Sequence, residues 1–353
     1  MKHTSKKILA VLLCMGLLLC SLSAMASAAD TARFSVLNYN VAGLPFSNPA
    51  GVEDWKVSVA QKYLGAQLNT TGYDIIATQE DFNYNANLRS ELTNYAYQTK
   101  HMGGVPVGDG MNVYSKFPIY NVERTEWNSR YGIINDGADE LTPKGIVYMV
   151  IKLADGVCID FYDIHADAFG DAGSVAARRD NFKQLAAIIN ARTIDRPVII
   201  TGDFNGSLHL EASSGIKEYL IDGCGFKDAW AELKNDGDYE DFSEMQAQYS
   251  YYWGLWDSVE RFLYKDGNGI ELEAEDFEYV RFEDAQGHSF SDHYAASCTF
   301  SYTLTDDFAP DTGKLEVKNE NAIKSFMLKI KHFIQALIKV LANLEDAIAF
   351  LKK

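Results

Sequence analysis

Short apolar runs recur through the middle of the chain, each bounded by Gly, Asp or Asn. Seven such runs, rich in Val, Ile, Tyr and Phe, predict β-strands: RFSVLNYNV (33–41), DIIATQE (74–80), GMNVYSK (110–116), GIVYMVIKL (145–153), GVCIDFYDIHA (156–166), RPVIITGDFN (196–205) and HYAASCTFSYTL (293–304). Residues 175–192 instead have helical spacing, with Phe182, Leu185 and Ile189 on one face. Many strands with few helices predict a single large α/β domain over residues 29–304.

The first 28 residues have a different pattern. Lys2, Lys6 and Lys7 precede an apolar run from Ile8 to Leu22, and small residues follow before Ala28. This order is typical of a secretory signal peptide. The run is short of the roughly 20 residues that span a bilayer. We therefore expect residues 1–28 to be removed and the protein to be secreted to the extracellular space.

The pattern changes again after Leu304. Residues 305–320 are polar and contain turn residues, which predicts a linker. In residues 321–353 an apolar position recurs every seven residues from Ile323 to Leu351, amid lysines, which predicts an amphipathic helix. Its stripe could dock on the main domain or pair with another copy. Alternatively, the helix could make peripheral membrane contact, because apolar faces with lysines suit anionic lipid surfaces.

Charge and cysteine content narrow the function only slightly. The formal net charge is −17, and the body is more negative without the lysines of the two ends. An acidic body does not attract polyanions by itself, although a divalent cation in a site can invert the local field. Cys158, Cys224 and Cys298 remain after the leader, which is a poor basis for a disulfide framework.

Polar side chains lie at the ends of the strand-like runs at four places. Asn40 lies in NYNVAGLP, Glu80 in TQED, Asp203 and Asn205 in TGDFNG, and Asp292 with His293 in SDH. Strand ends can aim such groups into one cleft. Carboxylate and amide oxygens are the ligands that Mg²⁺ accepts, so Mg²⁺ is the expected cofactor, with other divalent cations as alternatives.

Two histidines complete this set. Phosphoester hydrolysis needs a cation on the phosphate oxygens and a base for the attacking water. His293 could be that base, and His165 in YDIHADA could donate to the developing negative charge. Each residue taken singly also fits a structural role as a turn or cap residue. Coincidence is a poor explanation for all of them together.

The order and spelling of these segments resemble the endonuclease/exonuclease/phosphatase superfamily, which includes DNase I and the bacterial sphingomyelinases. The segments that carry the resemblance are LNYNVAGLP, ATQED, GDGMNVYSKFPI, LTPKG, DIHADA, ITGDFN, GFKDAW and SDHYA, between Phe34 and Leu304. GDFN followed by SDH is the specific pair. The resemblance implies a four-layered α/β/β/α sandwich and Mg²⁺-dependent cleavage of phosphoester bonds.

The resemblance also implies roles for individual residues. By position, Glu80 matches the main metal ligand, Asn40 its partner, and Asp292 a group near the metal. Asp203 and Asn205 match the residues that orient the water and hold the phosphate. His293 matches the general base, and His165 matches the histidine that stabilises the transition state or leaving group.

One position departs from the superfamily pattern. An Asp before an aromatic and apolar strand usually orients the base histidine, and here Glu260 in SVERFLY is its expected equivalent. Its side chain is one methylene longer, so the geometry could differ. Asp257 is the alternative. Such a carboxylate fixes the tautomer and the ring angle of a base histidine.

Three features favour a phospholipid substrate. NVAGLP and the KG of LTPKG, which contains Lys144, resemble the sphingomyelinase branch, and Lys144 is a predicted substrate-binding residue. The acidic body does not suit a non-specific polyanion binder, and the lysine-rich tail would bring an exported enzyme to lipid. The aromatic run Tyr249–Trp256 suits a lipid headgroup or ordinary core packing.

The leading hypothesis is a secreted Mg²⁺-dependent phosphodiesterase that releases the phosphorylated headgroup of sphingomyelin or a related phosphosphingolipid. The alternatives are a secreted DNase-like nuclease, whose partner would be nucleic acid, and a catalytically degenerate member that binds membranes.

Overall fold

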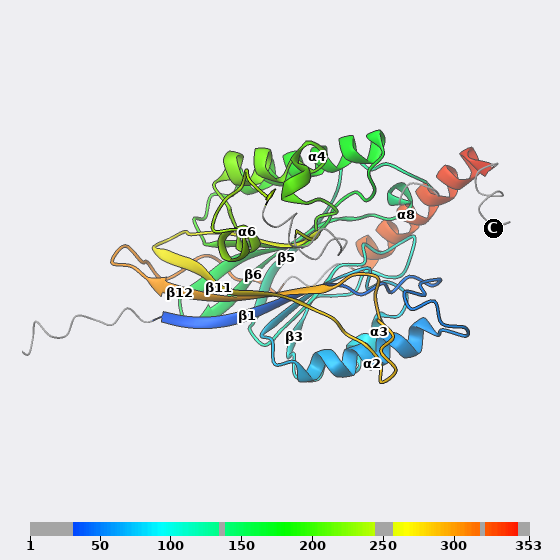
Figure 1. Cartoon of the computed structure of the whole chain (residues 1–353), viewed down its shortest axis with the longest axis horizontal. Coiled ribbons are helices and arrows are strands. Elements are labelled where there is room, and N and C mark those ends of the chain that lie inside the picture. The colour runs from blue at the N-terminus through cyan, green and yellow to red at the C-terminus, as the bar shows by residue number, and fades with distance from the viewer. Residues whose placement is uncertain (1–30, 134–137, 244–256, 318–321, 345–353) are drawn as a thin grey trace, which may run out of the picture.

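Two six-stranded β-sheets pack face to face in the computed structural model, and helices cover their outer sides (Figure 1). The structure describes residues 31–133, 138–243, 257–317 and 322–344. The predicted signal peptide and the aromatic run Tyr249–Trp256 lie outside the described residues.

The first sheet contains the chain's opening strand at its centre. Its strand order is β11 (Ile270–Val280), β12 (Ala295–Leu304), β1 (Thr31–Asn40), β2 (Ile75–Gln79), β4 (Asn112–Ser115) and β3 (Tyr97–Gln98). β1 pairs in parallel with β2 and antiparallel with β12. The ends of β1 and β2 therefore lie side by side.

The second sheet has the same plan. Its strand order is β5 (Ile119–Glu126), β6 (Gly145–Ala154), β7 (Val157–His165), β8 (Val198–Asp203), β10 (Glu260–Lys265) and β9 (Lys227–Asp228). β7 and β8 are parallel, with His165 opposite Asp203. Antiparallel pairing places Glu260, the first residue of β10, opposite Asp203 as well.

Helices form the two outer layers. On the first sheet lie α2 (Val57–Thr70) and α3 (Asn85–Arg89), and on the second lies α4 (Ala172–Asn190) (Figure 1). The single-turn α5 (Glu211–Ser214) packs against α4, and α6 (Ala229–Lys234) contacts β10 of the second sheet and β11 of the first. The predicted four-layered α/β sandwich is confirmed. The C-terminal helix α8 (Ala322–Ala342) is also present. No helix among the described residues is long and apolar enough to cross a membrane.

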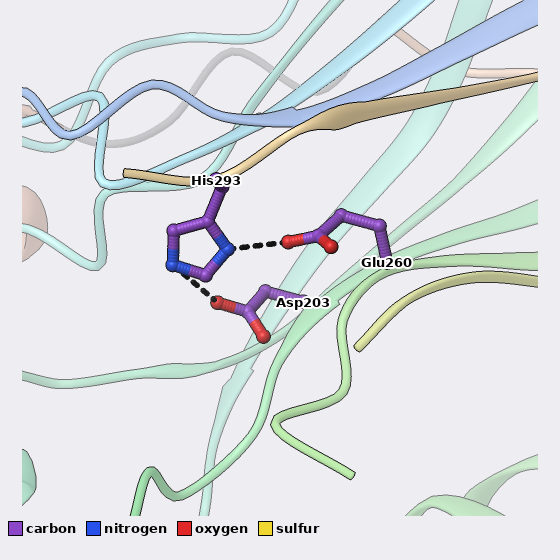
Figure 2. A group of neighbouring side chains, drawn as sticks. All are labelled: Asp203, Glu260 and His293. Atoms are coloured by element: carbon purple, nitrogen blue, oxygen red, sulfur yellow. Dashed lines mark hydrogen bonds and ion pairs between the residues drawn. The ribbon is translucent and has the colours of Figure 1, made fainter. Parts of the chain in front are cut away.

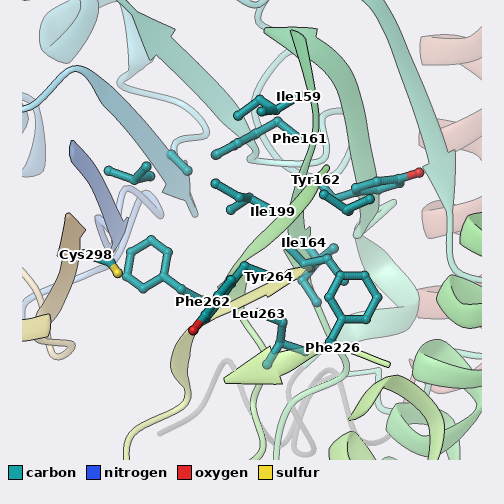
Figure 3. Packing of buried hydrophobic residues seen from close by; sticks show 14 of the residues in the cluster. Ile159, Phe161, Tyr162, Ile164, Ile199, Phe226, Phe262, Leu263, Tyr264 and Cys298 are labelled. Carbon is teal, nitrogen blue, oxygen red and sulfur yellow. The ribbon is translucent and has the colours of Figure 1, made fainter. Parts of the chain in front are cut away.

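The alternation of side chains along β1 explains how the layers join. Leu37 and Tyr39 belong to the apolar cluster beneath α2, whereas Phe34 and Val36 belong to the core between the sheets. Strand residues two apart share a face, so Asn38 and Asn40 continue the face that points at the second sheet. Figure 3 shows the facing residues of that core, among them Phe161, Phe262 and Cys298.

A buried polar chain crosses between the sheets where the apolar core ends. Asn38 Nδ2 donates to the Gly202 carbonyl at 2.9 Å, and Gln79 Nε2 donates to Asn38 Oδ1 at 2.8 Å and to Asp163 Oδ1 at 2.7 Å. Burial raises the pKa of Asp163 well above its ordinary value, which favours a neutral carboxyl here. These bonds hold β1 and β2 against β7 and β8 directly behind the strand ends.

The segment predicted as a linker packs along the domain where it is described. Arg196 pairs with Asp311, and the Asn121 side chain hydrogen-bonds to Lys314 and Glu316. Cys158, Cys224 and Cys298 are free thiols.

Candidate active site

The ends of four strands bring acids, amides and an imidazole together at one end of the sandwich. Asn40 ends β1, Glu80 follows β2, His165 ends β7 and Asp203 ends β8. Asn40 Nδ2 donates to Asp203 Oδ2 at 3.0 Å and to Glu80 Oε1 at 3.3 Å. One amide thus joins a carboxylate from each sheet.

Two residues of this cluster have a left-handed backbone that non-glycine residues seldom adopt. Their φ angles are 54° at Glu80 and 47° at Asn205. Such conformations cost on the order of 1–3 kcal/mol and persist where the surroundings fix them. At Asn205, the backbone N–H donates to Asp203 Oδ1 at 2.9 Å and Nδ2 donates to the Ala166 carbonyl at 3.1 Å. These two bonds fix the Asp203 carboxylate and the Asn205 amide beside the end of β7.

His293 enters the cluster from the loop before β12. Its Nδ1 lies 2.5 Å from Glu260 Oε1, and its Nε2 lies 4.0 Å from Asp203 Oδ2 (Figure 2). The Ser258 hydroxyl donates to the second oxygen of Glu260. The loop is tied to β1 because the Ser291 hydroxyl donates to the Asn40 carbonyl at 2.7 Å. With Nδ1 bonded to Glu260, Nε2 is the nitrogen that faces Asp203 and the open side.

The charges around His293 make it a strong proton acceptor. Burial by itself lowers the pKa of His293, but the Glu260 carboxylate and its hydrogen bond outweigh burial and raise that pKa well above its ordinary value. Burial also raises the pKa of Asp203. The environment therefore stabilises the imidazolium that forms when His293 takes a proton.

His165 has the opposite environment. It is 1% exposed, and its Nε2 lies 3.4 Å from Asp203 Oδ2. Burial, Lys144 and His293 lower its pKa well below the ordinary value, which favours a neutral ring. Its Nδ1 has no hydrogen-bond partner among the described residues. A neutral ring with a proton on Nε2 can donate a hydrogen bond without adding a charge.

Glu80 and Asn40 offer oxygen atoms of the kind that Mg²⁺ binds. Burial raises the pKa of Glu80, while Lys144 and His293 only partly offset that effect. A carboxylate removed from water gains most from a nearby cation, so this environment fits a bound divalent ion. Asp292 is exposed, but its charge acts on both Glu80 and His293. It therefore lies within reach of the same space.

Asp203, Glu260 and His293 also have ligand atoms within 4.8 Å of one another, the spacing of a metal site. The hydrogen bond between His293 and Glu260 accounts for that closeness without an ion. Mg²⁺ prefers oxygen ligands, so a proton-transfer chain is the better interpretation of these three residues. Glu80 and Asn40 remain the residues suited to the metal.

Lys144 is buried beside the cluster. Its Nζ lies 2.5 Å from Asp139 Oδ1, and the carboxylates of Asp139 and Glu80 raise its pKa against the effect of burial. Asp139 was not predicted from the sequence, since nothing in GADELTPKG distinguishes it from a surface acid. Lys144 therefore brings a fixed positive charge near Glu80 that Asp139 partly neutralises.

Asp257, the alternative partner of His293, lies in another network. Its Oδ2 is 2.8 Å from His209 Nδ1, and its Oδ1 accepts from Arg261. Arg261 is buried and also donates to Asp228 at 2.8 Å. Of the two carboxylates considered from the sequence, the structure places Glu260 against His293.

The order of these residues along the chain matches one known family. The profile of the Endonuclease/Exonuclease/phosphatase family matches residues 37–293. The chain belongs to this family. The superfamily predicted from the sequence motifs is therefore confirmed.

The sequence is similar to those of curated sphingomyelinases. A sphingomyelinase from Mycobacterium bovis is 29% identical over 277 residues, and the match covers 76% of this chain and 53% of the relative. This chain thus spans about half the length of the curated relatives it matches.

Solved structures support the fold alone. Sphingomyelinase C from Streptomyces griseocarneus superposes with a TM-score of 0.51 at 19% identity, over 76% of this chain and 99% of that one. A TDP2 of D. rerio in complex with a single-stranded DNA product has a TM-score of 0.55 at 14% identity, over the same shares of 76% and 99%. A beta toxin from Staphylococcus aureus with bound magnesium ions has a TM-score of 0.52 at 18% identity, over 76% and 99%.

Proposed function

We propose that this protein is a secreted, Mg²⁺-dependent phosphodiesterase that hydrolyses sphingomyelin or a related phosphosphingolipid and releases the phosphorylated headgroup. The observation that carries the proposal is the contact of His293 Nδ1 with Glu260, which leaves Nε2 facing Asp203. This arrangement supplies a base oriented by a carboxylate, next to amide and carboxylate groups that suit a phosphate and a cation. Family membership gives the coarser conclusion, a hydrolase of phosphoesters.

His293 and Asp203 act on the attacking water in this proposal. Nε2 takes one proton of the water while Asp203 holds the water in line with phosphorus. The oxygen adds to phosphorus, and the bond between phosphorus and the ceramide oxygen breaks. One water proton ends on the ceramide hydroxyl through solvent, and the hydroxyl that stays on phosphorus completes the phosphomonoester. Glu260 holds the ring angle and stabilises the imidazolium.

The remaining residues bind and stabilise the phosphate. Asn205 and Lys144 supply donors and positive charge to its oxygens, and His165 donates a hydrogen bond to the negative charge that develops. Glu80 and Asn40, with Asp292 nearby, would hold Mg²⁺, which when bound places positive charge on the phosphate oxygens. Preorganised donors of this kind are worth most in a site from which water is largely excluded.

The observations that support a lipid substrate differ from those that support phosphodiester hydrolysis. The mycobacterial relatives are named sphingomyelinases, and the NVAGLP and LTPKG segments surround Asn40 and Lys144. Secretion rests on the pattern of residues 1–28. A nuclease would use the same catalytic residues, so the substrate has to be tested separately.

The experiment measures two substrates side by side. The protein is incubated with sphingomyelin vesicles and with plasmid DNA, each with Mg²⁺ or with excess EDTA, and phosphorylcholine and nicked DNA are quantified. We expect phosphorylcholine release with Mg²⁺, none with EDTA, and intact DNA. Mg²⁺-dependent loss of DNA with intact lipid would overturn the substrate assignment but would leave the assignment of the active-site residues unchanged. Inactivity on both substrates would overturn the proposal.

A further inference from the structure

Helix α8 docks on the catalytic domain through its polar edge. His332 is 7% exposed; its Nδ1 lies 2.9 Å from the Val107 carbonyl and its Nε2 lies 2.7 Å from Glu126 Oε1. One turn further on, Ala336 is 6% exposed, and Lys339 pairs with Glu140. These contacts fix which edge of the helix faces the domain.

The opposite face of α8 and the turn after it is apolar and open to solvent. Its exposed apolar side chains range from 37% to 62% in exposure and are Phe326, Met327, Ile330, Phe333, Ile334, Leu337, Ile338, Leu341 and Leu344. At about 100° per residue they cover an arc of roughly 140°. An apolar stripe of this width normally faces a core, yet here the domain contacts the other edge. Within residues 31–133, 138–243, 257–317 and 322–344 the structure shows no partner for this apolar face, which the helix presents in a fixed orientation.

This face lies at the catalytic end of the sandwich. α8 packs against the short 3₁₀ helix η1 (Asp139–Leu141), whose Asp139 pairs with Lys144 beside the active site. Glu126, the partner of His332, is the last residue of β5 and lies opposite Gly145, the residue after Lys144. Figure 1 shows α8 at the end of the sheets where β1 finishes. Whatever covers the apolar face is thereby brought close to the active site.

The charge of the helix favours a phospholipid layer over a second copy of the chain. Residues 322–344 contain four lysines and no carboxylate, whereas the whole chain has a net charge of −17. Face-to-face pairing would bring two acidic bodies and two lysine-rich helices together, which opposes association. Lys331, 55% exposed, borders the stripe with its Nζ 3.9 Å from Glu126 Oε1, and its stem adds apolar surface beside the exposed face. Apolar side chains flanked by lysines match the headgroup and acyl boundary of a bilayer.

We propose that α8 is an interfacial helix: its exposed apolar face lies in the headgroup and acyl boundary of a phospholipid layer and holds the active site against that layer. The proposal deepens the proposed function, because an enzyme that cleaves a lipid headgroup must work at such a boundary. The membrane contact itself does not require sphingomyelin.

The test separates binding from catalysis. Binding of the full chain to phosphatidylcholine vesicles that lack sphingomyelin is measured by sedimentation, for wild type and for the double variant Ile334→Asn with Leu337→Asn. Ile194→Asn is the matched control, since Ile194 and Ile334 are both 47% exposed and Ile194 precedes β8 at the end opposite Asp203. Hydrolysis of the water-soluble diester bis(p-nitrophenyl) phosphate reports on the active site without a membrane.

We expect the double variant to bind vesicles at least about tenfold more weakly, because each apolar side chain that leaves water contributes substantially to binding. The control should bind like wild type, and all three proteins should hydrolyse the soluble diester equally. Unchanged vesicle binding in the double variant would overturn the proposal. An equal loss of vesicle binding in Ile194→Asn would overturn it as well. A wild-type dimer that the double variant converts to a monomer, without vesicle binding, would assign the face to a second copy. Failure of the proposed function would instead appear as inactivity toward sphingomyelin with vesicle binding intact.

Discussion

Glu260 Oε1 lies 2.5 Å from Nδ1 of His293, at a position where the family pattern usually has the shorter carboxylate of Asp. The Ser258 hydroxyl donates to the other oxygen of Glu260, so both oxygens of this carboxylate are hydrogen-bonded. His293 keeps an oriented partner, and its Nε2 faces the reacting groups.

Replacing Glu260 should lower turnover through His293. In Glu260→Gln the amide can donate to Nδ1, which favours the tautomer with the proton on Nε2, so His293 can no longer accept a proton there. We expect kcat to fall by about 10²-fold or more with little change in KM, as for other oriented base histidines. Ser258→Ala keeps the Glu260 carboxylate, so its kcat should fall much less. Steady-state kinetics of both variants check this, and equal losses would contradict the orienting role of Glu260.

Removing the charge of Glu80 should remove metal binding. Glu80→Gln keeps the size of the side chain but takes away the carboxylate that Mg²⁺ prefers, so both Mg²⁺ affinity and turnover should be lost while the fold remains. Calorimetric titration with Mg²⁺ measures the first effect independently of activity. Glu271→Gln on the exposed face of β11 is the control and should bind Mg²⁺ normally. Normal Mg²⁺ binding by Glu80→Gln would assign the metal to other residues.

Gly202 should not tolerate a side chain. Its φ is 146°, and a Cβ there would lie 2.0 Å from the Ile164 carbonyl oxygen, between β7 and β8. The two strands would have to separate exactly where they end in His165 and Asp203. We expect Gly202→Ala to lower both the melting temperature and the activity. By comparison, Gly225→Ala is also strained by a φ of 76° but meets no atom within 4 Å, so it should lose some stability and keep the activity. An active, fully stable Gly202→Ala protein would contradict the close strand contact.

Docking of α8 should depend on pH through His332 and Glu126. Burial lowers the pKa of His332, but the hydrogen bond to Glu126 outweighs it, so the pKa is raised above its ordinary value of 6.5. The hydrogen bond from His332 lowers the pKa of Glu126 below its ordinary value of 4.5. The stabilisation of α8 docking by protonated His332 is complete below pH 6.5 and is lost as the pH rises through the raised pKa. The stabilisation of α8 docking by ionised Glu126 is complete above pH 4.5 and is lost as the pH falls through the lowered pKa.

Docking should therefore be strongest between these two ordinary values. Amide hydrogen exchange of α8, corrected for the intrinsic effect of pH on exchange, should show protection at pH 5.5 that decreases at high pH. Arg130 and Lys331 also face Glu126 but keep their charge over this range, so they do not produce the change. His332→Gln should show weaker protection without the pH dependence. A pH dependence that survives in this variant would contradict the account.

The sequence predicted four strands that end at the active site because those strands are buried on both faces. β10, which carries Glu260 and is also buried, was not among the seven predicted runs. β1, β2, β7 and β8 consist mostly of buried residues and form the dense apolar runs from which they were predicted. β11 was missed because buried and exposed residues alternate along it, so glutamates interrupt its apolar residues. β5 was missed because its residues are half-buried, and α2 was masked by its small and polar residues. Apolar density therefore found most of the inner strands and overlooked the edge strands β5 and β11.

Site residues could be predicted where they follow such strands, and not where a contact depends on the tertiary structure. Asn40, Glu80 and Asp203 all meet, as their places at strand ends suggested. The sequence favoured Glu260 over Asp257 through its place before an apolar strand, but the contact with His293 depends on the register of β10 against β8. The pairing of Lys144 with Asp139 depends on a loop that no local pattern specifies.

The most direct test of the account is the rate of phosphorylcholine release from sphingomyelin in Mg²⁺ by wild type and by His293→Ala. General-base catalysis typically contributes about 10²–10⁴-fold, so we predict a loss of at least about 10²-fold, with unchanged vesicle binding and Mg²⁺ affinity. A loss of less than about tenfold would contradict the assignment of His293 as the base on which the proposed mechanism depends.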